Sequence, residues 1–310
     1  MKIVYFGSSN FSLTILEGLM HANFTPELIV SQPDKPKGRG LSFCPTKVSE
    51  FARKNNLPLI KPASLKSTKI IDELKNIGAD LFVIADYGKI LPGSLLSATK
   101  IASIGVHPSL LPAYRGPAPI NWVLINGDKE TGVTIFKMDE GLDTGDMVLQ
   151  KKIIINDIDN ADTLHDKLAA LGAKVLIEAI SMLGKNNCAF KPQEETLSSC
   201  APKLKKDDGK INWGLEAERI KNLIRATLGW PSAYTYYKNK MIKIIDSEVL
   251  FELIKHEPST IVGIDKNGIS VATGKNILKI KRLKPEGKKE MDAYSFVIGH
   301  KLVVGDKFGQ

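Results

Sequence analysis

Two short motifs contain residue types that could perform acid and base chemistry. Residues 105–112 read G-V-H-P-S-L-L-P and place His107 at the end of an apolar run, immediately before a proline. Residues 138–146 form an acidic turn in which glycines flank Asp143. A carboxylate beside an imidazole fixes the tautomer of the ring, and such a pair can move protons at a carbonyl group. A lone histidine is usually structural and an acidic turn is usually solvated, so the prediction depends on both motifs together.

The sequence lacks the patterns of covalent, metal-dependent and dinucleotide-dependent catalysis. Ser109 has no base beside it in the sequence. The cysteines Cys44, Cys188 and Cys200 have neither metal-ligand spacing nor the pattern of a disulfide framework. The first glycine turn, at Gly7, does not continue into the G-x-G-x-x-G of dinucleotide sites. We therefore expect no metal, no dinucleotide and no covalent enzyme intermediate.

The two motifs resemble those of the folate-dependent formyltransferase superfamily, whose members transfer a formyl group from 10-formyltetrahydrofolate to an amine. Both H-P-S-L-L-P and G-L-D-T-G-D are present, and the spacing of 36 positions from histidine to aspartate also matches. The resemblance implies that His107 and Asp143 are catalytic. It also implies a folate site that comprises Ser109, Leu110, Leu111, Pro112, Asp86, Tyr87, Gly88 and Asp139. Asp86 departs from the more usual V-A-Y-G pattern, which leaves the pterin contacts at that loop open.

One position of the first motif departs from the superfamily. Members usually carry asparagine two residues before the histidine, where its amide is thought to hold the formyl oxygen, whereas this sequence has Gly105. Loss of one oxyanion donor can cost about 3 to 4 kcal/mol of transition-state stabilisation. The sequence leaves three replacements open: a backbone N–H, a water molecule in the space left by the missing side chain, or protonated His107.

A basic loop near the N-terminus indicates which branch of the superfamily the chain resembles. Residues 32–40 read Q-P-D-K-P-K-G-R-G, similar to a loop of methionyl-tRNA formyltransferases that reaches the tRNA acceptor stem. Glycinamide-ribonucleotide formyltransferases lack this loop. The resemblance runs nearly end to end and implies methionyl-initiator tRNA as the partner, with contacts from Lys35, Lys37, Arg39 and Lys47.

The charge distribution is consistent with a polyanionic partner. The chain of 310 residues has a formal net charge of +9. Residues 1–200 carry a net charge of +1, and residues 201–310 carry +8. A basic surface confined to one third of the chain favours nucleic acid as the partner of that part.

Other functions remain open from the sequence. A 10-formyltetrahydrofolate hydrolase or an amino-sugar N-formyltransferase would use the same chemistry. The related hydrolases and dehydrogenases also depart from asparagine at the position of Gly105, and they share I-N-W runs like residues 120–122 and 211–213. A non-catalytic RNA-binding protein derived from an enzyme is supported by Gly105 alone. The basic loop and the basic C-terminal third favour the tRNA-directed transferase.

Strands and helices must alternate to position these residues. Apolar runs predict strands at 2–6, 27–31, 81–85, 102–107, 131–138 and 146–155. Helical spacing of apolar residues predicts helices near 12–22, 47–55, 70–76 and 163–183. The alternation predicts an α/β, Rossmann-like domain with a mostly parallel sheet, helices on both faces and a ligand site at the carboxyl ends of the strands.

The last hundred residues have a different character. A helix near 216–228 precedes short β-rich runs at 233–237, 241–245, 261–264, 269–272 and 277–283, which predict a small, OB-like β-barrel. We predict a formyltransferase catalytic domain at 1–187, a linker at 188–208 and a basic tRNA-binding barrel at 209–310. No apolar run is long enough to cross a membrane, and the cysteine usage fits a reducing cytoplasm. A partner as large as tRNA makes a monomer sufficient.

Overall fold

The computed structural model describes residues 1–37, 42–185, 188–252 and 255–309, and the chain divides into two units. The first unit comprises Met1–Pro119, Glu130–Ile154 and His165–Ala201. The second comprises Ile120–Lys129, Ile155–Leu164 and Pro202–Gln310. No helix within the described residues is long and apolar enough to span a membrane.

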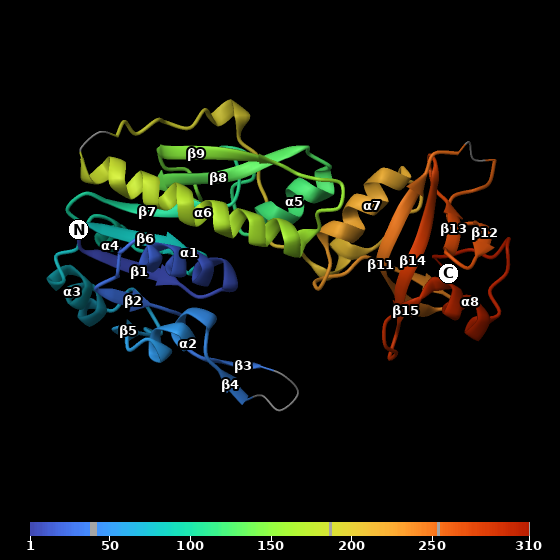
Figure 1. Cartoon of the computed structure of the whole chain (residues 1–310), viewed down its shortest axis with the longest axis horizontal. Coiled ribbons are helices and arrows are strands. Elements are labelled where there is room, and N and C mark those ends of the chain that lie inside the picture. Colours follow the sequence, from blue (N-terminus) through green and yellow to red (C-terminus); the bar gives the residue numbers. More distant parts are fainter. Residues whose placement is uncertain (38–41, 186–187, 253–254, 310) are drawn as a thin grey trace. The chain divides into compact units, whose positions relative to one another are not determined.

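A seven-stranded sheet with the order β5-β2-β1-β6-β7-β8-β9 organises the first unit (Figure 1). The strands from β5 to β7 are parallel, and β8 and β9 continue the sheet in antiparallel pairing. This confirms the predicted mostly parallel α/β sheet. Its strands are β1 (Ile3–Gly7), β2 (Leu28–Val30), β5 (Leu59–Ile60), β6 (Leu81–Ala85), β7 (Ala102–His107), β8 (Glu130–Lys137) and β9 (Met147–Ile154).

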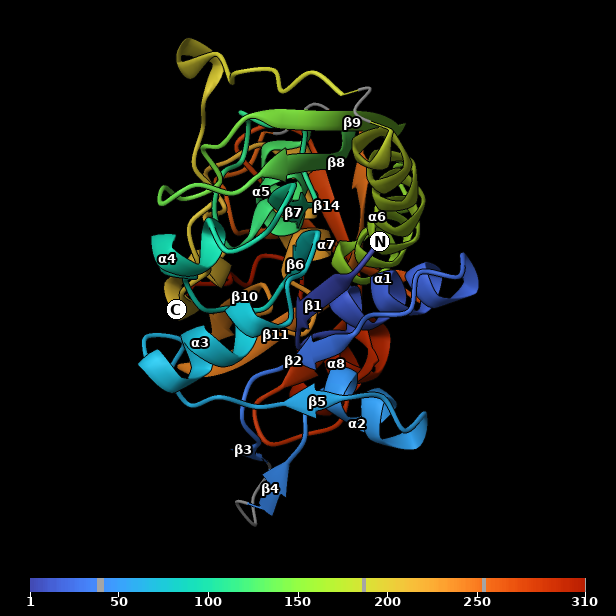
Figure 2. The same ribbon diagram turned by 90° about the vertical axis from the view of Figure 1, so that its left-hand side faces the viewer.

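The central strands are buried along their whole length because helices cover both faces of the sheet. Every residue of β1, β6 and β7 is buried, as expected for the interior of a parallel sheet. Figure 2 shows α1, α2 and α6 on one side of the sheet and α3 and α4 on the other. The helices are α1 (Asn10–His21), α2 (Lys47–Lys54), α3 (Thr68–Asn76), α4 (Gly93–Leu96) and α6 (Ala161–Gly184). The helix α5 (Pro119–Asn126) belongs almost entirely to the second unit.

Local sequence signals explain where the first helix begins. The Ser9 side chain accepts a hydrogen bond from the Ser12 backbone N–H and caps α1, which satisfies one donor that the helix start leaves open. The apolar residues Ile15, Leu16 and Leu19 follow at helical spacing and are fully buried. Because β1 ends at Gly7, the turn between β1 and α1 lies at the carboxyl end of that strand, where the sequence predicts a ligand site.

A short hairpin that the sequence did not predict follows β2. It consists of β3 (Lys35–Lys37) and β4 (Ser42–Cys44), in which Lys35 pairs with Cys44 and Pro36 with Phe43. The basic loop predicted for residues 32–40 therefore enters a hairpin. Three residues of that loop, Gly38, Arg39 and Gly40, lie outside the described residues.

The second unit contains an antiparallel sheet with the order β10-β11-β14-β13-β12, and β15 pairs with β14. The eleven-residue β11 has register irregularities between Ile244 and Ser247, where a bulge bends a strand. The unit confirms the predicted C-terminal β domain. Its elements are α7 (Ala217–Ala226), β10 (Tyr234–Tyr237), β11 (Lys240–Leu250), β12 (Ile261–Asp265), β13 (Gly268–Ala272), β14 (Ile277–Pro285), β15 (Met291–Asp292) and α8 (Ala293–His300).

An apolar core joins the helices and strands of this unit. Trp213 stacks on Phe308 with ring centroids 5.8 Å apart, and both side chains are buried. Phe296 of α8 is also buried in this core. The sequence did not predict α8, since A-Y-S-F-V-I-G-H lacks a polar face and resembles a strand. Asp292 caps the helix by accepting a hydrogen bond from the Ser295 backbone N–H.

The predicted linker contains the 3-10 turn Glu195–Leu197, and a second 3-10 turn, Lys206–Gly209, runs across its end. Its first part, up to Ala201, belongs to the first unit and is bonded there to the start of β9 and to the loop after β7. Lys191 and Met147 exchange two backbone hydrogen bonds, and Arg115 bonds in the same way with the backbone of Ser199 and Ala201. We call residues 191–201 the strap.

Candidate active site

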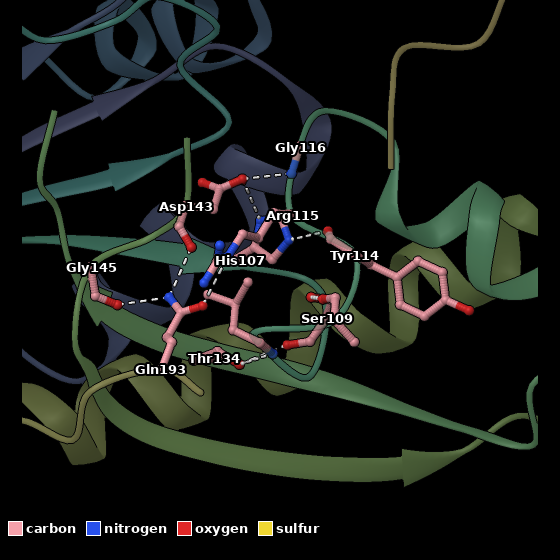
Figure 3. A network of polar contacts seen from close by, with 11 residues as sticks. His107, Ser109, Tyr114, Arg115, Gly116, Thr134, Asp143, Gly145 and Gln193 are labelled. Carbon is pink, nitrogen blue, oxygen red and sulfur yellow. Dashed lines mark hydrogen bonds and ion pairs between the residues drawn. The ribbon is translucent and has the colours of Figure 1, made fainter. Parts of the chain in front are cut away.

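The two predicted catalytic residues lie together at the end of β7. The Nδ1 atom of His107 is 3.6 Å from Oδ2 of Asp143, and both side chains are largely buried. The Nε2 atom of the ring lies 2.8 Å from the backbone carbonyl oxygen of Tyr114. Both ring nitrogens therefore face oxygen atoms, the Tyr114 carbonyl at hydrogen-bond distance and the Asp143 carboxylate at a longer distance. Figure 3 shows the ring between these partners.

The turn that carries Asp143 has an unusual backbone and is held from several directions. Asp143 itself has a φ of +56°, in the left-handed region that costs non-glycine residues about 1 to 2 kcal/mol. The Gly116 backbone N–H donates to Oδ2 of Asp143 at 2.8 Å. A Cβ atom on Gly145 would lie 1.7 Å from the Lys137 carbonyl oxygen, so only glycine fits there. The carboxylate is thus fixed at the atom that faces His107.

Asp139, predicted to contact folate, uses its carboxylate within the same turn. Oδ1 accepts hydrogen bonds from the Gly141 backbone N–H at 3.0 Å and from the Thr144 hydroxyl at 2.8 Å. Asp139 is exposed, but these bonds give its side chain a clear role in shaping the turn.

The backbone of the Ser109–Pro112 loop is held by hydrogen bonds to two residues that the sequence did not single out, Thr134 and Gln150. The Thr134 hydroxyl donates to the Ser109 carbonyl oxygen at 2.7 Å and accepts from the Leu111 backbone N–H at 3.1 Å. Gln150 donates to the Leu111 carbonyl oxygen at 3.0 Å. Ser109 is itself buried, and its hydroxyl donates to the Ala113 carbonyl oxygen at 2.6 Å. Its side chain therefore stabilises the loop.

Within this loop, the side chains of Ser109 and Leu111 are almost fully covered, whereas the other two side chains are more exposed. Leu110 and Pro112 are partly exposed, so they are the members of the predicted folate signature that can present an apolar surface to a ligand. The role of Thr134 in holding this loop follows from the strand register, because Thr134 of β8 pairs directly with His107 of β7.

The space beside Gly105 is filled by an aromatic ring. Gly105 pairs with Phe136 of the neighbouring strand β8, so both residues face the same side of the sheet. A Cβ atom on Gly105 would lie 2.5 Å from Cε1 and 2.7 Å from Cζ of Phe136. The same ring meets His107 edge to face, with centroids 6.4 Å apart. Phe136 therefore takes the space that a side chain at position 105 would enter, which argues against a water molecule there.

The loop of Asp86, Tyr87 and Gly88 lies at the end of β6. Asp86 is exposed and Gly88 packs against Gln32, whereas the Tyr87 side chain is buried against Phe6. The Tyr87 hydroxyl has no hydrogen-bond partner among the described residues, and burial raises its pKa to about 12. The Tyr87 side chain therefore packs in the core beneath the loop rather than on its exposed surface.

A pocket of about 280 Å³ opens at the carboxyl ends of β1, β2 and β6. It brings the β1–α1 turn and the β3–β4 hairpin together with Asp86 and Gly88, but it does not include His107 or Asp143. Its lining residues are Ser8, Ser9, Gln32, Pro33, Lys35, Cys44, Pro45, Thr46, Asp86 and Gly88.

The predicted tRNA-contacting lysines have different surroundings. Lys35 is exposed at the pocket, and its Nζ donates to Gln32 Oε1 at 2.6 Å. Lys47 forms an ion pair with Glu50 at 3.0 Å. The side chain of Lys37 and the whole of Arg39 lie outside the described residues.

Arg115 and Gln193 belong to the same network, although the sequence indicated neither. The Arg115 side chain is 9% exposed and donates through Nε to Gln193 Oε1 at 3.0 Å. Gln193 donates in turn to the carbonyl oxygens of Asp143 and Gly145, as Figure 3 shows. Arg115 lies three positions after the H-P-S-L-L-P motif, whereas Gln193 lies in a segment without periodicity, which offered no signal.

Comparison with known proteins agrees with this site. The family model for formyl transferase matches residues 1–180, and that for the formyl transferase C-terminal domain matches residues 203–301. The methionyl-tRNA formyltransferase of Alkaliphilus oremlandii is 42% identical over 310 residues, covering all of both chains. That of Thermodesulfovibrio yellowstonii is 44% identical over 303 residues, 98% of this chain and 97% of its own. The chain belongs to the methionyl-tRNA formyltransferase family.

Solved structures of more distant proteins share the fold of this methionyl-tRNA formyltransferase family member. The sugar 3N-formyl transferase WlaRD has a TM-score of 0.67 at 21% identity, covering 93% of this chain and 99% of its own. HypX from Aquifex aeolicus in complex with tetrahydrofolic acid has a TM-score of 0.66 at 13% identity, covering 99% of this chain and 48% of its own. At these identities the similarity establishes the fold alone. The full-length relatives therefore decide between the alternatives that the sequence left open.

Proposed function

We propose that this chain transfers the formyl group of 10-formyltetrahydrofolate to the α-amino group of methionyl-initiator tRNA, in the cytoplasm, where charged tRNA is used for translation initiation. One observation carries the proposal: the His107–Asp143 pair, 3.6 Å apart, in a chain about 40% identical along its whole length to methionyl-tRNA formyltransferases. The amino-sugar and hydrolase alternatives have no comparable support.

The reaction begins when the neutral amine of the methionyl group attacks the formyl carbon. The carbonyl π bond opens and leaves a negative charge on the formyl oxygen of a tetrahedral intermediate. A protonated His107 ring next to that oxygen would stabilise the charge and then supply the proton to the departing folate nitrogen. The bond between the formyl carbon and that nitrogen breaks, and the amine loses one proton. The products are formyl-methionyl-tRNA and tetrahydrofolate.

Asp143 orients His107 in this scheme and receives the proton of the amine through a water molecule. The hydrogen bond from Gly116 keeps one carboxylate oxygen directed at the ring. Gly105 has no side chain, and the Phe136 ring beside it has no hydrogen-bond donor. Oxyanion stabilisation therefore comes from His107 or from a backbone N–H, the two remaining replacements for the usual asparagine amide.

Folate binds, in this proposal, against the exposed parts of the Ser109–Pro112 and Asp86–Gly88 loops. Leu110 and Pro112 supply apolar contacts, and the Asp86–Gly88 backbone supplies polar contacts to the pterin. The buried Ser109 and Leu111, together with Asp139, hold the loops in place rather than touching the ligand.

The tRNA contacts come from the hairpin and from the second unit. Lys35, exposed at the pocket, provides positive charge beside the carboxyl ends of the strands, where the acceptor end must arrive. Lys47 at the start of α2 and the sequence-predicted Lys37 and Arg39 complete the proposed set of contacts. The net charge of +8 on residues 201–310 supplies a nonspecific attraction to the phosphate backbone. We propose that residues 209–310 are the domain that holds the body of the tRNA, and that one monomer is sufficient.

The experiment is an incubation of the protein with 10-formyltetrahydrofolate labelled in the formyl group and with methionyl-initiator tRNA. We expect acid-stable formyl-methionine on the tRNA. Parallel reactions without tRNA and with a nucleotide-linked amino sugar test the alternatives. Release of free formate alone would show a hydrolase, and tRNA binding without turnover would show a non-catalytic binding protein.

A further inference from the structure

The strap, residues 191–201, is bonded next to the Asp143 turn and to the loop that follows His107. Near one end, Lys191 and Met147 exchange backbone hydrogen bonds of 2.8 and 2.9 Å, directly after the Asp143 turn. Near the other end, Arg115 donates through its backbone N–H to the Ser199 carbonyl oxygen at 2.8 Å, and the Ala201 N–H donates to the Arg115 carbonyl oxygen at 2.7 Å. Between these attachments the strap is mostly exposed, but the side chain of Gln193 turns inward and is half-buried.

The Gln193 amide takes part in the network through both its nitrogen and its oxygen. Nε2 donates to the carbonyl oxygen of Asp143 at 2.8 Å and to that of Gly145 at 2.7 Å. Oε1 accepts from Nε of Arg115 at 3.0 Å. A guanidinium can only donate, so Arg115 fixes which end of the amide faces the turn. Both carbonyl groups lie on the C-terminal side of the left-handed residue Asp143, whose conformation is costly for a residue with a side chain.

Arg115 is in turn held by an ion pair. Its two terminal nitrogens each donate to one oxygen of Glu195 at 2.9 Å, in the paired geometry typical of arginine and a carboxylate. This contact lowers the pKa of Glu195 below its usual range. Arg115 directly precedes Gly116, whose backbone N–H binds the Asp143 carboxylate. The network is therefore closed: it passes from Asp143 through Gln193 and Arg115 and returns to the Asp143 carboxylate through Gly116.

We infer that Gln193 is a positioning residue for catalysis, acting through the backbone of the Asp143 turn to keep the Asp143 carboxylate against His107. Gln193 does not touch the reacting atoms. It holds two carbonyl groups of the turn, that of Asp143 and that of Gly145, directly after the side chain that orients the catalytic ring. A misplacement of a catalytic group by about 1 Å can lower a rate by about 100-fold, and 3.6 Å leaves little room before the contact between Asp143 and His107 is lost.

The chemistry of the amide makes glutamine specific at this position. Two donors and one acceptor are needed in one plane, at the reach of a four-atom side chain. Glutamate would place oxygen atoms against two carbonyl oxygens, and methionine would have nearly the same length without any strong donor. The pair Gln193→Glu and Gln193→Met therefore separates the loss of donors from the loss of bulk. Glu194→Met, at the adjacent exposed position, is the matched control.

The first test measures steady-state formyl transfer in the full chain, and it rests on the proposed function. We expect Gln193→Met to lower kcat by about 10- to 100-fold, with KM for tRNA and for folate changed by less than about threefold. Gln193→Glu should lower kcat at least as much, and Glu194→Met should stay within about twofold of the parent. A folded Gln193→Met variant with a kcat within twofold of the parent would overturn the inference.

A second test needs no substrate and therefore separates this inference from the proposed function. Hydrogen exchange of the peptide spanning residues 139–147 is followed by mass spectrometry in the parent, Gln193→Met and Glu194→Met. We expect exchange to become at least about fivefold faster in Gln193→Met alone, while peptides from β1 and β6 keep their protection. Unchanged exchange in the turn would refute the role of Gln193, whether or not the parent forms formyl-methionine.

Discussion

Replacing Gly105 with asparagine restores the amide that the superfamily usually carries, and the structure indicates why this change should fail on its own. The first atom added, Cβ, would lie 2.5 Å from Cε1 and 2.7 Å from Cζ of Phe136. Atoms at such distances must move apart, and Phe136 is only 2% exposed, with His107 at the edge of its ring. The new side chain therefore pushes the ring into packed surroundings that include the catalytic histidine.

The magnitude follows from the overpacking of a buried site. Adding atoms to a well-packed core costs about 1 to 3 kcal/mol, and in a chain of this size each kcal/mol lowers Tm by about 2 to 4 °C. We expect Gly105→Asn to lower Tm by roughly 2 to 12 °C, and we expect no gain in formyl transfer. Phe136→Val removes as many heavy atoms as Gly105→Asn adds, so the double variant should recover at least half of the lost Tm.

The assay combines thermal unfolding of the parent, both single variants and the double variant with single-turnover formyl transfer. Phe136→Val alone should also be destabilised, because it leaves a cavity beside Gly105. The loss of stability in the double variant should then be smaller than the sum of the losses in the two single variants, as expected for residues in contact. An unchanged or raised Tm in Gly105→Asn would refute the packing argument. A gain in rate of about a hundredfold in the same variant would refute the view that the position tolerates no amide.

Two further predictions concern the pocket and the buried tyrosine. Lys35→Ala should reduce the slope of log affinity for tRNA against log salt concentration by about 0.7 to 0.9, the effect of one lost phosphate contact, whereas Lys69→Ala on α3 should leave it unchanged; equal slopes would remove Lys35 from the interface. Burial raises the pKa of Tyr87 to about 12 in the folded state, whereas the pKa of a tyrosine in the unfolded chain is near 10. Ionisation of the hydroxyl therefore favours unfolding as the pH rises between these values. Tyr87→Phe should therefore lose about 1 kcal/mol less stability than the parent between pH 9 and pH 11, measured by urea unfolding, and an identical pH dependence would contradict the burial of the hydroxyl.

Local sequence patterns were sufficient for much of the first unit. The apolar run 102–107 became β7 with the predicted bounds, and the paired motifs brought His107 and Asp143 together as expected. Such features are visible because burial on both faces produces continuous apolar runs and because a proline and two glycines mark the ends of the loops. The mostly parallel sheet follows from the same alternation of strands and helices.

The rest depends on register and on long-range contacts. Phe136 fills the space of Gly105 because β8 pairs with β7 at that position, and the sequence of one strand does not reveal its partner in the next. Gln193 binds the Asp143 turn from 50 positions away, in a segment that has no periodicity. Tyr87 was assigned to a ligand loop, but the side-chain direction that buries it depends on packing against Phe6. Contacts of this kind become visible only when the chain is folded.

The central claim is that His107, oriented by Asp143, performs the transfer step. The most direct test is single-turnover formyl transfer by His107→Ala at saturating methionyl-initiator tRNA and 10-formyltetrahydrofolate, together with tRNA affinity measured by filter binding. The account predicts that the transfer rate falls by at least about 100-fold, as expected for a lost acid and base group, while the Kd for tRNA changes by less than about threefold. Retention of more than about a tenth of the parent rate by a folded variant would contradict it.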